Sequence, residues 1–107
     1  MTLENIKNLK VLMTRAIGVA VEENADTTPY LMSCLKRVYS GDYGELKEED
    51  IDANNTELKN GVGRLVCRYK KAHGLNNDIY IIAIFNSDID INNLDYNHIM
   101  IMYVNEY

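Results

Sequence analysis

The segment from Ile79 to Phe85 constrains the fold of this chain most strongly. It consists only of aliphatic and aromatic residues and is rich in isoleucine, a β-branched residue that favours strands. Because polar residues do not alternate with the apolar ones, the pattern predicts a central strand that is covered on both faces. The turn-forming run His73 to Asp78 precedes this strand, and the polar loop Asn86 to Asn97 follows it. The sequence therefore predicts a sheet built around this strand.

Two further segments supply the neighbouring strands. Arg64 to Lys71 alternates apolar with basic residues, which predicts a strand with one core face and one solvated face. Ile99 to Val104 is the last apolar strand candidate. We therefore expect an α+β fold, in which short helices pack on one face of an antiparallel sheet of three or four strands.

The first part of the chain predicts mostly helices. The N-terminal segment fits both a helical stripe and a short strand, and we favour a helical turn that passes into a strand near Leu9 to Arg15. Ile17 to Glu23 predicts a short helix. Thr28 is a good N-cap, and Pro29 suits the first position of a helix that runs to about Tyr39.

The segment from Leu46 to Asn60 is dominated by acidic and amide residues. Its acidic residues suit the first turns of one or two short helices, and Gly61 and Gly63 end the helical pattern. The exposed side of these helices would be strongly negative.

Length and charge exclude several classes of protein. The 107 residues suit one domain, covering residues 1–107, that buries a single core. A net charge of −5 disfavours direct binding to nucleic acid, which needs many lysine and arginine contacts to phosphates. No apolar stretch is long enough to span a membrane, and charged residues interrupt any signal-like N-terminus. We expect a cytoplasmic protein in which Cys34 and Cys67 stay reduced.

The known catalytic and metal-binding patterns are absent from the sequence. The loop Asp88 to Ile99 resembles a calcium loop, but Asn93 replaces the required glycine and Ile99 the bidentate glutamate. No serine lies in a GxSxG motif, and Gly61-Val62-Gly63 lacks the rest of a phosphate-binding loop. We therefore expect neither an enzyme nor a bound cofactor. The possible zinc ligands lack paired spacing, and they are Cys34, Cys67, His73 and His98.

The sequence instead shows a strong charge pattern in the segment from Asp42 to Glu57. Seven acidic residues lie between Asp42 and Glu57, where Lys47 is the only basic residue. Such a segment indicates a surface that docks against a basic protein, and Tyr43 beside it is a possible aromatic anchor. The predicted partner-binding residues are Asp42, Tyr43, Glu45, Glu48, Glu49, Asp50 and Asp52.

An ordered series of short motifs carries a resemblance to a known family. The series includes Thr14-Arg15 with Gly18-Val19, Cys34-Leu35-Lys36-Arg37, Gly41-Asp42-Tyr43-Gly44-Glu45, Ile79-Tyr80-Ile81-Ile82 and the terminal Glu106-Tyr107. In these motifs the chain resembles small bacterial proteins of plasmids and phages, loosely labelled plasmid-related proteins or mislabelled as subunits of type I restriction enzymes. The chain departs from that family after Ile82, where Ala83 to Asn86 replaces the family's polar sequence.

The resemblance implies an origin on a mobile genetic element. Small acidic proteins of such origin often occupy the nucleic-acid-binding groove of a host defence enzyme, and the sharpest expectation is an anti-CRISPR protein directed at a type II effector. The acidic segment would then mimic the phosphate charges of nucleic acid. An alternative is an accessory protein that binds a small molecule or a metal without catalysis. A homodimer is a further possibility, because the exposed edge of a small sheet invites pairing.

Overall fold

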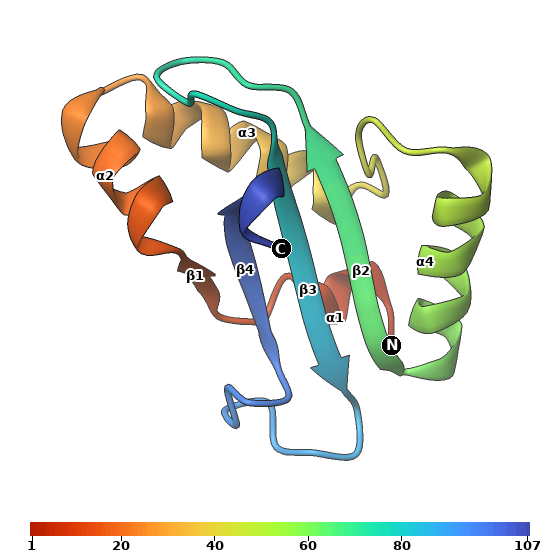
Figure 1. The fold of residues 1–107 in the computed structure, drawn as a ribbon. Coiled ribbons are helices and arrows are strands. Elements are labelled where there is room, and N and C mark those ends of the chain that lie inside the picture. Colours follow the sequence, from red (N-terminus) through yellow and green to blue (C-terminus); the bar gives the residue numbers. More distant parts are fainter.

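The computed structural model describes residues 1–107 and contains one four-stranded sheet (Figure 1). In spatial order the strands are β1 (Val11–Met13), β4 (His98–Tyr103), β3 (Ile79–Asn86) and β2 (Val62–Tyr69). The predicted central position of the Ile79 to Phe85 segment is confirmed, since β3 pairs with β2 on one side and with β4 on the other. The predicted α+β class is also confirmed.

The sheet is mixed, which corrects the expectation of a purely antiparallel sheet. Strands β2, β3 and β4 form an antiparallel meander, whereas β1 pairs in parallel with β4 and places Leu12 beside Met100. Consecutive strands joined by short loops must run antiparallel. Strand β1 has no such constraint, because three helices and two strands separate it from β4 along the chain.

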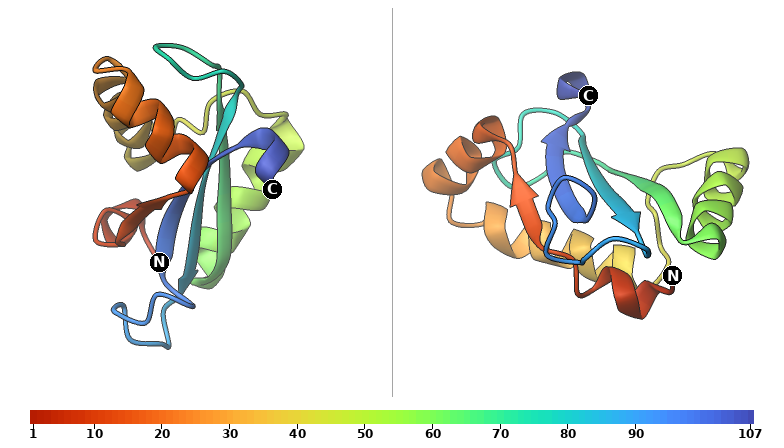
Figure 2. Two further views of the ribbon diagram at one scale, coloured as in Figure 1. Left: turned by 60° about the vertical axis from the view of Figure 1, so that its left-hand side comes forward. Right: turned by 90° about the horizontal axis from the view of Figure 1, so that it is seen from below.

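Three helices cover one face of the sheet. They are α1 (Leu3–Ile6), α2 (Arg15–Glu23) and α3 (Thr27–Tyr39), and they lie together on one side of the strands in Figure 2. The core lies between these helices and the sheet, and Ile17, Leu31 and Val38 from the helices are buried there. From the sheet, the buried side chains of this layer include Leu65, Cys67, Tyr69, Ile81, Phe85, Ile99 and Ile101.

The start of α3 differs from the prediction. The helix begins at Thr27, with Asp26 rather than Thr28 at the N-cap position. Thr27 is fully buried, and its hydroxyl donates a hydrogen bond to the carbonyl oxygen of His73. This contact with a loop far away in the sequence fixes the helix start, and local capping preferences could not reveal it.

The fourth helix departs from the expected one-sided arrangement. The predicted helical segment forms a single helix, α4 (Glu48–Asn60), which packs along β2 at the edge of the sheet. Figure 2 shows α4 apart from the layer formed by α1, α2 and α3. The short 3₁₀ turn η1 (Val104–Glu106) follows β4. None of the helices is long and apolar enough to cross a membrane.

A single buried side chain of α4 connects this helix to the sheet. The Asn54 Nδ2 donates to the carbonyl oxygen of Val66 at 2.9 Å, and the Val66 N–H donates to Asn54 Oδ1 at 3.0 Å. These two bonds replace the hydrogen bonds that a further strand would make to the edge of β2. Asn54 is the only buried residue of α4, whereas Ile51 and Leu58 are partly buried where they pack against the core.

We predict that Asn54→Ala destabilises the fold by roughly 2–4 kcal/mol, because it leaves the N–H and C=O groups of Val66 without partners beneath α4. Urea unfolding followed by circular dichroism would measure this loss. Asn60→Ala is the matched control, since Asn60 is exposed at the end of the same helix. An equal cost for the two variants would contradict the edge-capping role of Asn54.

Candidate functional site

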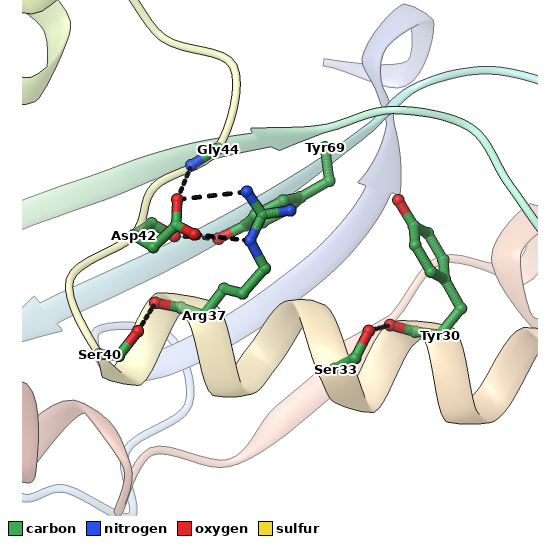
Figure 3. A network of polar contacts seen from close by, with 7 residues as sticks. All are labelled: Tyr30, Ser33, Arg37, Ser40, Asp42, Gly44 and Tyr69. Atoms are coloured by element: carbon green, nitrogen blue, oxygen red, sulfur yellow. Dashed lines mark hydrogen bonds and ion pairs between the residues drawn. The ribbon is translucent and has the colours of Figure 1, made fainter.

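The turn from Gly41 to Glu45 is tied to the core by a polar network (Figure 3). Arg37 of α3 donates from Nε to Asp42 Oδ2 at 2.7 Å and from Nη2 to Asp42 Oδ1 at 3.3 Å. The Gly44 N–H donates to the same carboxylate at 3.1 Å, and the Tyr69 hydroxyl donates to the Asp42 carbonyl oxygen at 2.7 Å. The Arg37 guanidinium also lies 4.8 Å from the centre of the Tyr69 ring. This network gives Asp42 a structural role.

Tyr43 lies inside the protein, which corrects its interpretation as an exposed aromatic anchor. Its side chain is only 5% exposed and belongs to the hydrophobic core. The hydroxyl donates to Asn55 Oδ1 of α4 at 3.0 Å, so the ring joins the turn to the helix. A tyrosine with its ring buried and its hydroxyl paired stabilises the fold and is not available to a partner.

The same turn covers the far end of β2. The Arg68 N–H donates to the Tyr43 carbonyl oxygen at 3.1 Å, and the Glu45 N–H donates to the Arg68 carbonyl oxygen at 2.8 Å. Gly44 lies between them in a parallel bridge to Arg68, at a φ of +80°. Together with Asn54, these residues satisfy the edge of β2 at Val66 and Arg68.

The four acidic residues in the first turns of α4 divide into two groups around the helix. At about 100° per residue, Glu48, Glu49 and Asp52 fall on one side, and Asp50 falls on the other side with Asn54. All four carboxylates are exposed and none forms an ion pair. We call Glu48, Glu49 and Asp52 the acidic face. It surrounds the N-terminal end of α4, where the helix dipole stabilises negative charge.

Asp50 and Glu45 line a groove of about 490 Å³ between α4 and β2. The cations Lys47, Arg64 and Arg68 also line this groove. Glu57 is the third acidic residue of the lining, so acidic and basic side chains are equal in number there. The uncharged residues of the lining are Leu46, Ala53, Asn54, Val66 and Tyr80.

The structure thus keeps only part of the predicted partner-binding set together. Glu48, Glu49 and Asp52 share an exposed surface, whereas Glu45 and Asp50 belong to the groove. The sequence did not predict this groove. The alternation of Arg64 and Arg68 along β2 predicts a polar side of that strand, but it cannot indicate which helix lies opposite.

The two cysteines are free and buried, and burial raises the pKa of the Cys67 thiol to about 12. His73 lies beside the Tyr30 ring, and His98 Nδ1 contacts the carbonyl oxygen of Leu94. The structure contains no group of three or more histidine, cysteine or acidic side chains placed to hold a metal ion. Buried thiols with a raised pKa are poor nucleophiles and poor metal ligands.

The chain matches no protein-family model, no curated protein and no solved structure. The resemblance to small proteins of mobile elements therefore stays a prediction that rests on short motifs.

We predict that Gly44→Ala destabilises the protein by about 2–4 kcal/mol. A Cβ atom at this position would lie 1.9 Å from the Arg68 carbonyl oxygen, and backbone cannot move aside without breaking the edge contact. Gly18→Ala is the control, because a Cβ atom there meets nothing within 4 Å and the residue lies inside α2. That change should stabilise by about 0.5–1 kcal/mol. Urea unfolding of both variants tests the contrast, and similar effects would contradict it.

A second prediction concerns acid stability. The Arg37 guanidinium and the Gly44 N–H lower the pKa of Asp42 below its ordinary value. The stability contributed by this carboxylate is therefore present above its unfolded-state pKa and is lost as the pH falls through the lower folded-state pKa. Asp42→Asn should be less stable than the wild type at neutral pH and should lose less free energy of unfolding on acidification.

Urea unfolding at a series of pH values between about 6 and 2 would measure this difference. Asp88→Asn removes an exposed carboxylate that has no ion-pair partner and serves as the control. Parallel pH profiles for Asp42→Asn and the wild type would contradict a role of the Arg37 contact in acid stability.

Proposed function

We propose that this protein acts by binding another protein, and that the acidic face of α4 docks against a basic surface that otherwise holds nucleic acid. The observation that carries the proposal is the arrangement of Glu48, Glu49 and Asp52 at one helix end, exposed and without ion pairs. Neighbouring carboxylates without counter-ions repel one another, so a row of lysine or arginine residues would relieve that repulsion on binding.

The position of the acidic face supports docking. Helix α4 is fixed to β2 by Asn54 and to the turn by Tyr43, so the carboxylates project from a helix whose backbone is held in place. A surface on such a helix loses little backbone conformational entropy on binding, which favours affinity. Because α4 lies at the edge of the sheet, away from α1, α2 and α3, a large partner could reach its outer side (Figure 2).

The choice of partner follows from the resemblance to proteins of mobile elements. The proposed target is a host defence nuclease, with a type II CRISPR effector as the first candidate. Such an enzyme holds its guide and target nucleic acids in positively charged channels. The acidic face would compete with the phosphates for those channels, and no catalysis by this chain is needed.

A cleavage assay with a purified type II effector, its guide RNA and target DNA tests the proposal. We predict that a molar excess of this protein slows cleavage, and that added salt weakens the inhibition because it screens the charges. Undiminished cleavage at large excess would rule out the effector that was tested.

The triple variant Glu48→Lys, Glu49→Lys and Asp52→Lys should weaken inhibition at least about tenfold, since opposite charges then face the partner's cations. The control variant reverses Glu22, Glu23 and Asp26, which are also exposed acids, at the junction of α2 and α3. Both variants change the net charge equally. Equal loss of inhibition in the two would indicate an effect of total charge and would contradict docking through the acidic face.

A further inference from the structure

The two edges of the sheet differ in whether their outward backbone groups are hydrogen-bonded. At the β2 edge, Asn54 and the turn around Gly44 occupy the outward backbone groups of Val66 and Arg68. At the opposite edge, β1 is the outermost strand and no element pairs with its outer side (Figure 1). An uncovered edge presents free N–H and C=O groups to any strand that can pair with it.

The pairing of β1 with β4 shows which of its groups are free. The Ile99 N–H donates to the Lys10 carbonyl oxygen at 2.8 Å, and the Thr14 N–H donates to the Ile101 carbonyl oxygen at 3.0 Å. Bonding alternates along a parallel strand, so the N–H and C=O groups of Val11 and Met13 point away from the sheet. The side chains of Val11 and Met13 are 36% and 44% exposed. The edge therefore offers both backbone groups and apolar surface.

We propose that a second copy of this chain pairs with β1 along this edge, antiparallel about a two-fold axis that passes beside Leu12. Val11 then lies opposite the partner's Met13, and Met13 lies opposite the partner's Val11. In each of these two pairs, the N–H of each residue donates to the C=O of the other, which makes it a hydrogen-bonded pair of an antiparallel ladder. The two four-stranded sheets become one continuous sheet of eight strands.

The charges beside β1 favour a second copy as the occupant. In this register Lys10 lies opposite the partner's Thr14, and opposite residues in an antiparallel pair project on the same side of the sheet. In each copy the Thr14 hydroxyl donates to Glu106 Oε1 at 2.9 Å, and the Tyr103 N–H donates to the same oxygen at 2.8 Å. The carboxylate of Glu106 is thus fixed at Thr14.

Lys10 of one copy therefore meets the carboxylate of the partner's Glu106, and the two-fold axis repeats the contact. Within a single copy neither Lys10 nor Glu106 forms an ion pair. Arg15, the other cation near this edge, is the first residue of α2 and lies outside the paired segment. The edge is self-complementary in hydrogen bonds, apolar contacts and charge, as a two-fold interface requires.

Sedimentation equilibrium over a series of protein concentrations tests the proposal. The wild type should show a reversible monomer–dimer equilibrium. The double variant Val11→Lys and Met13→Lys should stay monomeric at concentrations where the wild type is a dimer, because lysines on an edge strand repel a second copy. A matched control places lysines at Val62 and Met32, which are 45% and 56% exposed and lie away from β1. This control should still dimerise.

A charge reversal tests the register. Lys10→Glu should weaken dimerisation about tenfold, since it converts two ion pairs into two repulsive contacts. Adding Glu106→Gln should recover part of that loss, because the amide oxygen can still accept from Thr14 and Tyr103 while the repulsive charge is removed. Circular dichroism should show that every variant keeps the wild-type secondary structure. A monomeric wild type at all concentrations would overturn the proposal, and so would a dimer that survives Val11→Lys and Met13→Lys or a Lys10→Glu loss that Glu106→Gln does not reduce.

Discussion

The covered edge of β2 is the constraint on which much of this structure depends. Strand β2 has β3 on one side only, and its outward backbone groups must find partners elsewhere. Asn54 supplies them at Val66, and the Tyr43 to Glu45 turn supplies them at Arg68. These contacts fix the positions of α4 and of the turn, and they explain why Gly44 must lack a side chain beside the Arg68 carbonyl oxygen.

This way of holding α4 also explains its composition. A helix that packs on a core needs a wide apolar stripe. Helix α4 instead recognises a strand's backbone through one amide side chain, with Ile51 and Leu58 packed only partly against the core. Its outer side is then free of packing constraints, and it carries Glu48, Glu49 and Asp52 at the helix end where negative charge is favoured. The attachment of α4 through Asn54 therefore accounts both for its few buried side chains and for the exposed carboxylates of its proposed docking surface.

The opposite edge of the sheet, formed by β1, is not covered by another element. Strand β1 contains only three residues, and Val11 and Met13 stay 36% and 44% exposed at this edge. Glu106 lies at this edge, because its carboxylate accepts a hydrogen bond from the Thr14 hydroxyl. The surfaces proposed for the heterologous partner and for the second copy lie at opposite edges of the sheet.

The sequence by itself determined the α+β class, the central position of the strand at Ile79 to Phe85, the inward side of β2 and the helical acidic segment, because hydrophobic periodicity and turn residues are local properties of the chain. The prediction that the central strand is covered on both faces was wrong, because Tyr80 and Ile84 on its second face are only partly buried. Only the tertiary structure decided that β1 pairs in parallel with β4, that α3 begins at Thr27 and that Tyr43 is buried. Each of these features depends on a contact between residues far apart in the sequence, such as that of Thr27 with His73. The acidic residues illustrate the same division: their charge is written in the sequence, but their separation into the acidic face and the groove arises from the way Asn54 orients α4 against β2.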